Sequence, residues 1–128
     1  MSAAPAPDNH ARLRVAAGPL VAPVLSRVVG MLAARAQCPI DRLDDAMLLA
    51  DAIAAHAPHF TVDDYLRVKV DADVQGLSLV VDGLRPDAGR DLVAAAELPG
   101  VGNVLRHVTD EIDEEPDGAS LRIRLGFR

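Results

Sequence analysis

The stretch YLRVKVDA, residues 65–72, alternates aliphatic with polar side chains, and Leu66, Val68 and Val70 form the aliphatic set. Successive side chains of a β-strand point to opposite faces, so this pattern predicts a strand with one apolar and one wet face. Such strands are typical of antiparallel sheets covered on one side, whereas buried parallel strands are apolar throughout. The stretch therefore predicts a mostly antiparallel sheet with one open face.

Three further stretches show the same alternation and extend the predicted sheet. In the stretch at residues 77–82 the alternation is imperfect, because Val80 falls on the polar side. The three stretches are RLRV at 12–15, LSLVVD at 77–82 and SLRIRLGF at 120–127.

Two long segments are expected to be helices that cover this sheet. Residues 19–37 are apolar over most of a helical circumference, and Pro23 is tolerated if the helix begins near it. The second helix, residues 41–57, is expected to begin at the cap residue Asp41 and to end before Pro58.

Shorter helices are expected within residues 87–98 and from Val101 to Val108. The order of elements is then strand, two helices, two strands, two short helices and two strands. One layer of helices on one sheet is the simplest way to bury the apolar faces of both. The predicted fold class is α+β, a two-layer sandwich.

The length of 128 residues fits a single domain, predicted over residues 11–128, with residues 1–10 as a flexible tail rich in Ala and Pro. The start of the chain lacks the pattern of a secretory signal, and no apolar run approaches the roughly 20 residues of a membrane span. These features favour a cytoplasmic protein. The single cysteine, Cys38, is expected to be a small buried residue.

The formal net charge is −6, which would repel nucleic acid and anionic lipid unless basic side chains were gathered on one face. With two Phe, one Tyr and no Trp, the chain offers no platform for stacking bases. We therefore expect neither a nucleic acid nor a membrane partner.

The second predicted helix carries the first candidate for chemistry. Asp51 and Ala55 are four residues apart and so share a face. Asp51 is either a general base or a solvated carboxylate at the helix edge. His56 and His59 have a spacing that suits a metal, but Pro58 interrupts the helix between them and no third ligand is evident, so no metal site is predicted.

Glycines and an acid supply the remaining candidates. Gly100 and Gly102 precede a predicted helix, where free backbone N–H groups bind phosphate, although a tight turn explains them equally. Asp82 ends a predicted strand and is followed by a loop that contains Gly83 and Gly89. Turn formation alone accounts for most of that loop.

Taken in order, these features resemble the small serine-kinase anti-sigma factors (switch-protein kinases) of the GHKL ATPase superfamily, over roughly residues 12–127. The resemblance implies the Bergerat, or histidine-kinase-like, fold. The second helix of that family reads approximately E-x-x-x-N-x-x-x-H. Asp51 falls on its acid, which acts as the base, Ala55 on the Asn that holds magnesium, and His59 on the final His.

Two further motifs of the family are matched in part. Its D-x-G-x-G after a strand falls on Asp82, which matches the adenine-reading acid, but Leu84 and Pro86 stand where glycines belong. Its later G-x-G is matched by Gly100 and Gly102. These two glycines and Asp82 are the cofactor-binding residues that the resemblance implies.

The departures from the family indicate lost kinase activity. Alanine offers magnesium no oxygen, and Asp in place of Glu draws the base back by about one methylene, a displacement that can cost on the order of 100-fold in rate. The leading hypothesis is a non-catalytic, degenerate GHKL homologue that needs no cofactor. As a bacterial regulator of transcription of the anti-sigma type, it would bind a sigma factor or an anti-sigma antagonist and form a homodimer.

Two alternatives stay open at this point. The first is an active, ATP-dependent protein serine kinase that phosphorylates an antagonist protein, with Asp51 as base and ATP and magnesium bound. The second is a sensor that binds nucleotide without turnover, for which the retained Gly100 and Gly102 are the motivation. The sequence also leaves open whether the segment from Arg85 to Leu98 is a lid over a nucleotide or has collapsed.

Overall fold

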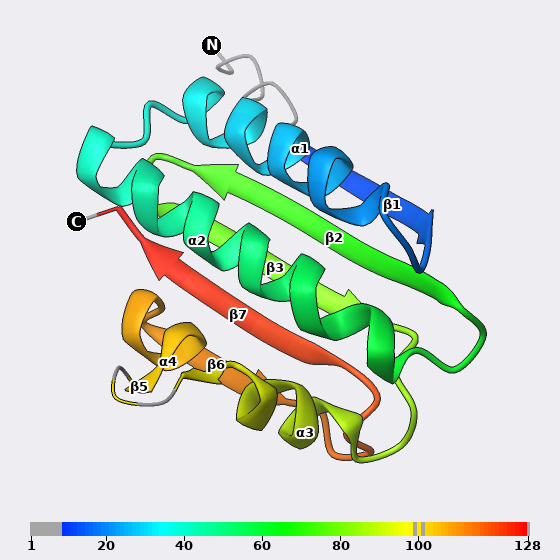
Figure 1. Ribbon diagram of the computed structural model, residues 1–128. Helices are drawn as coiled ribbons and strands as arrows, with labels where there is room; N and C mark the ends of the chain where they lie inside the picture. Colours follow the sequence, from blue (N-terminus) through cyan, green and yellow to red (C-terminus); the bar gives the residue numbers. More distant parts are fainter. Residues whose placement is uncertain (1–8, 99, 101, 128) are drawn as a thin grey trace, which may run out of the picture.

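The chain folds into two layers, a five-stranded sheet and helices that lie against one face of it (Figure 1). The computed structural model describes residues 9–98, 100 and 102–127. All neighbouring strands of the sheet run antiparallel, in the order β1-β2-β3-β7-β6. Their bounds are His10–Ala16 for β1, Tyr65–Asp73 for β2, Gly76–Asp82 for β3, Glu111–Glu114 for β6 and Leu121–Gly126 for β7.

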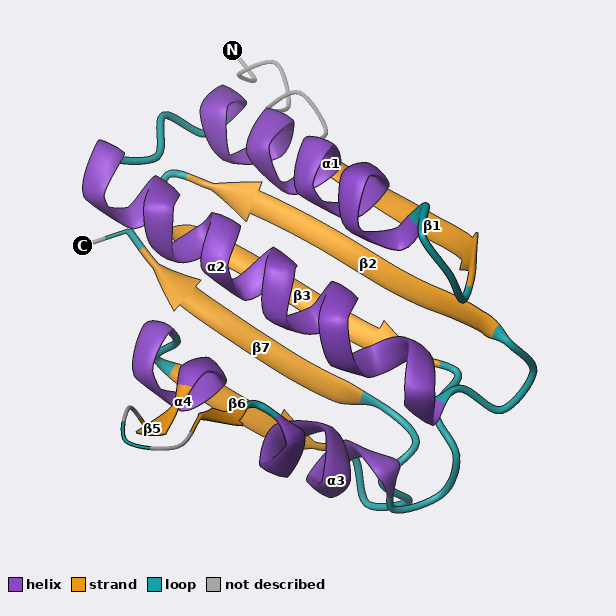
Figure 2. Ribbon diagram, in the orientation of Figure 1, coloured by secondary structure: helices purple, strands orange, loops and turns teal. Residues whose placement is uncertain are grey.

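The predicted fold class is confirmed: the protein is an α+β two-layer sandwich with an antiparallel sheet covered on one face by helices (Figure 2). The alternation seen in the sequence is reproduced in the burial of β2, where Leu66, Val68 and Val70 are buried. Arg67 and Lys69 point to the opposite face, on which no helix lies among the described residues.

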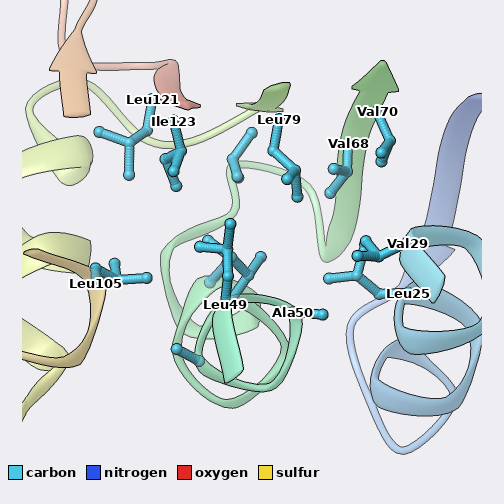
Figure 3. Close-up of a cluster of buried hydrophobic side chains, with 14 of the residues drawn as sticks. Leu25, Val29, Leu49, Ala50, Val68, Val70, Leu79, Leu105, Leu121 and Ile123 are labelled. Carbon is cyan, nitrogen blue, oxygen red and sulfur yellow. The ribbon is translucent and has the colours of Figure 1, made fainter. Parts of the chain in front are cut away.

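Helix α1, Val21–Arg35, begins two residues before Pro23, close to the expected start. Pro23 therefore lies in the first turn, where a backbone N–H has no partner within the helix and its loss costs little. The inner face of α1 places Leu25 and Val29 over Val68 and Val70 of β2 (Figure 3).

Helix α2, Ile40–His56, begins one residue before Asp41, so the prediction that Asp41 caps it is wrong. The residue at the cap position is Pro39, whose extended backbone sets the direction of the chain, and no side chain accepts a capping hydrogen bond there. Asp41 lies in the first turn instead, where a carboxylate still complements the helix dipole. The end of α2 agrees with the prediction, because Pro58 falls in the short 3₁₀ helix η1, Ala57–Phe60.

The last third of the chain forms short elements beside β7 and β6. The helix expected from Val101 begins at Val104 instead, because Gly102 and Asn103 pair with the preceding segment as a small two-stranded sheet. Val101 itself lies outside the described residues. The bounds are Ala88–Ala95 for α3, Glu97–Leu98 for β4, Gly102–Asn103 for β5 and Val104–Val108 for α4.

Two details differ from the expected domain limits and core. The ordered fold includes Asn9, whose side-chain amide donates to the backbone oxygens of Leu32 and Ala72, both at 2.9 Å. Residues 1–8 of the expected tail lie outside the described residues. Cys38 is half-buried rather than buried, and burial still raises the pKa of its thiol. None of the helices in the described part of the chain has the length and apolarity to span a membrane.

Candidate functional site

Asp51 lies on the side of α2 that faces α1. Its carboxylate Oδ1 is 3.4 Å from the hydroxyl of Ser26 on α1, which donates a hydrogen bond to it. Leu49, two residues earlier on α2, is fully buried and points toward the sheet (Figure 3). Asp51 is exposed, so its surroundings match those of a solvated carboxylate at a helix edge.

Ala55 lies one turn beyond Asp51 and is also exposed. It lines a cavity of about 320 Å³ at the end of α2, together with Ala17, Gly18, Ala54, Pro58 and His59. The His59 imidazole is the one polar side chain among these residues, so this cavity offers no carboxylate to bind a cation. Across the described residues, no group of three His, Cys, Asp or Glu side chains is placed to hold a metal ion.

Asp82, at the end of β3, lies on the open face of the sheet. Its Oδ1 accepts a hydrogen bond of 2.5 Å from the hydroxyl of Ser120. The register places Asp82 directly opposite Arg67 of β2, and both residues line a cavity of about 260 Å³ on that face. The helices lie on the other face, so Asp82 and Asp51 belong to opposite layers of the molecule.

The loop after Asp82 is held by backbone hydrogen bonds to two other segments. Leu84, which stands where the family has a glycine, is only 3% exposed, and its amide donates to the Ala119 carbonyl at 3.1 Å. The amide of the next residue, Arg85, donates to the Phe60 carbonyl at 2.9 Å. Leu84 thus serves as a core residue that anchors the loop.

A close contact of backbones fixes the same loop at its far end. Asp87 has a positive φ of 63°, and its amide donates to the Asp117 carbonyl at 3.0 Å. Gly118 lies against it so closely that a Cβ on Gly118 would be 2.4 Å from the Asp87 Cα. Only glycine fits at position 118, because its φ of 68° is also unfavourable for other residues.

The segment from Arg85 to Leu98 is folded into the core. It forms α3, whose inner face buries Leu92 completely and leaves Val93 only 4% exposed. Leu105 of α4 is likewise fully buried in the same cluster. The segment is therefore packed as part of the domain core, and this packing favours a collapsed segment over a mobile lid.

Gly100 and Gly102 lie in the connection before α4, with positive φ values of 77° and 102°. Asn103 separates them from α4 and caps it, because its Oδ1 accepts from the amide of Arg106 at 3.2 Å. The Asn103 Nδ2 donates to the Val93 carbonyl at 2.6 Å. Both polar atoms of this side chain are therefore used within the fold and are not directed toward a metal ion.

The predicted site residues occupy three separate places. Asp51 faces α1, Asp82 lies on the open face of the sheet, and the two glycines lie beyond α3 at the β6 side of the molecule (Figure 1). The structure does not bring them together around one ligand.

The open face of the sheet holds a second group of functional candidates, which the sequence analysis did not identify. Six cationic side chains gather there, out of 13 in the chain. We call this surface the basic sheet face, and its members are Arg12, Arg14, Arg67, Lys69, Arg122 and Arg124. The sequence showed each alternating strand, but the strand order that places these residues side by side appears only in the fold.

Ion pairs and a ring contact engage part of this surface. Arg67 forms two hydrogen bonds with the Asp63 carboxylate, at 2.7 and 3.1 Å. That contact lowers the pKa of Asp63 and raises the pKa of Arg67. The Arg14 guanidinium lies 4.0 Å from the centre of the Tyr65 ring, a cation–π contact.

Comparison with known proteins identifies no family for this chain. No protein-family model matches the chain, and no curated protein matches it.

Proposed function

We propose that this chain is a non-catalytic protein-binding domain, a degenerate relative of the GHKL serine-kinase anti-sigma factors. The observation that carries the proposal is the separation of Asp51, Asp82 and the pair Gly100 and Gly102. Phosphoryl transfer needs base, metal and phosphate-binding groups around one substrate, since it relies on positioning and charge neutralisation.

The packing of α3 supports the same proposal. A lid over a nucleotide must open to admit its ligand, and segments that move in this way have few buried apolar contacts. Leu92 and Leu84 hold this region in the core with exposures of 0% and 3%. A lid that opened at α3 would have to break these contacts.

In its anti-sigma role, the domain works in the bacterial cytoplasm, and its partner is a sigma factor or an anti-sigma antagonist. A homodimer is the expected assembly. These elements of the proposal derive from the sequence resemblance, and the antiparallel two-layer fold is compatible with them.

Calorimetric titration with ATP and ADP, with and without magnesium, tests the proposal. We expect no binding up to millimolar nucleotide and no transfer of labelled phosphate to a candidate antagonist. Magnesium-dependent binding at micromolar concentrations would show that Ala55 has been compensated and would support the kinase. Binding without phosphate transfer would support the sensor.

A further inference from the structure

On the basic sheet face, two pairs of cations lie directly opposite each other on neighbouring strands and repel each other. Arg12 lies directly opposite Lys69, and Arg14 lies directly opposite Arg67, in the register of β1 and β2. Like charges directly opposite each other on one face of a sheet destabilise the pairing. Two adjacent pairs of this kind concentrate positive charge on β1 and β2.

The other side of the same face is better compensated. Arg122 on β7 lies opposite Asp113 of β6, and its guanidinium is 3.6 Å from Glu115. Arg124 lies opposite Glu111 and donates to the Ser78 hydroxyl at 2.9 Å. On β1 and β2, Arg67 is paired with Asp63, so the charge without an acidic partner there centres on Arg12 and Lys69.

Arg12 and Lys69 are the centre of that charge. Both are exposed, and neither side chain makes a hydrogen bond or an ion pair with another residue in the described part of the chain. They line the cavity of about 260 Å³ that also contains Arg14 and Arg67. A second cavity of about 200 Å³, which Arg12 and Lys69 line as well, continues along the strands.

We propose that these four cations, the β1–β2 basic cluster, bind an extended acidic segment of a protein partner. The inference rests on the proposed function, in which the domain acts by binding proteins. Carboxylates of the segment would pair with Arg12 and Lys69 and relieve the repulsion across β1 and β2.

The spacing of the cations fits such a segment. Residues two apart on a strand are about 6.6 to 6.8 Å apart, which applies to Arg12 with Arg14 and to Arg67 with Lys69. An extended peptide with acids at alternate positions has the same repeat. Such a peptide, lying along β1 and β2, would present one carboxylate to each successive cation.

The neighbouring groups favour protein carboxylates over a nucleic acid backbone. Asp82 and Asp71 flank the cluster on the same face and would repel any anion that extends past the four cations, so a short acidic segment fits better than a continuous row of phosphates. Tyr65 is the one aromatic residue of β2 and is already covered by Arg14, so there is no free ring for base stacking. The net charge of −6 opposes approach of a polyanion from a distance, but a short acidic segment carries less charge.

The net charge of −6 does not exclude an anionic partner at this surface. From sequence, nucleic acid and anionic lipid were excluded unless basic side chains were gathered on one face, and the fold gathers them there. The exclusion therefore does not apply to the β1–β2 basic cluster.

The test is fluorescence anisotropy with a labelled peptide of alternating Glu and Thr as the probe. The test variant is Arg12→Glu with Lys69→Glu, two exposed positions in the middle of their strands. The control is Arg27→Glu with Arg90→Glu, two exposed arginines on α1 and α3 that give the same change in net charge. Circular dichroism of both variants checks that the fold is retained.

We expect the native chain to bind the peptide and the affinity to fall as salt rises, because exposed ion pairs are screened. The test variant should lose about tenfold or more in affinity, and the control less than about twofold. No binding up to millimolar peptide, an equal loss in the control, or tighter binding of a single-stranded oligonucleotide than of the peptide would each overturn the inference. The nucleotide titration is independent, so either proposal can fail without the other.

Discussion

Replacing Leu92 by Ala tests whether α3 belongs to the core or is a mobile lid. The Leu92 side chain is fully buried, so its truncation removes buried carbon worth about 2.4 kcal/mol in transfer free energy. The cavity left behind adds to this loss by about 24 cal/mol per Å³. We expect the free energy of unfolding to fall by about 3 to 4 kcal/mol, a large share of the stability of an ordinary domain.

The matched control is Leu48→Ala on α2, where the side chain is 49% exposed. Its loss should be no more than about 1 kcal/mol. Urea denaturation followed by circular dichroism gives both values, and the melting temperature of the Leu92 variant should fall by about 10 °C. A Leu92→Ala variant that is as stable as the control would refute the packing of α3 and restore the lid interpretation.

Three other predictions concern the loop, the helix cap and an ion pair. Gly118→Ala should lower the free energy of unfolding in urea by more than about 1 kcal/mol because of its positive φ and its contact with Asp87, and a neutral effect would contradict the close packing. Asn103→Ala should cost about 1 kcal/mol in the same assay through loss of the α4 cap, and an unchanged midpoint would count against that cap. The Asp63 carboxyl should titrate below its ordinary pKa of 3.8 in NMR, and Arg67→Gln should raise that pKa. Because the folded pKa is the lower one, the stabilisation from this pair is present above the unfolded pKa and is lost as the pH falls through the folded pKa. An Asp63 pKa that does not respond to Arg67→Gln would contradict the ion pair.

The sheet and its covered face could be predicted from sequence because alternation is a local signal. Leu66, Val68 and Val70 are separated by charged residues, and this pattern alone determines which face is buried. The ends of helices and strands were harder to predict from the sequence. Pro39 rather than Asp41 sets the start of α2, because backbone geometry there replaces a capping side chain.

The arrangement of the candidate sites could not be predicted, because it depends on contacts between distant segments. The sequence gives the positions of Asp51 and Asp82 along the chain, but only the packing of α1 beside α2 shows that Asp51 faces Ser26. The same holds for the β1–β2 basic cluster. Arg12 and Lys69 are 57 positions apart in the sequence and become neighbours through the pairing of β1 with β2.

The most direct test of the central claim is an amide NMR spectrum of the ¹⁵N-labelled chain, recorded with and without millimolar ATP and magnesium. It reports each predicted site residue separately. The proposal predicts that the amides of Asp51, Asp82, Gly100 and Gly102 keep their positions, since these residues do not share a ligand. Saturable, magnesium-dependent shifts of those amides would contradict it and show that the residues assemble around a nucleotide.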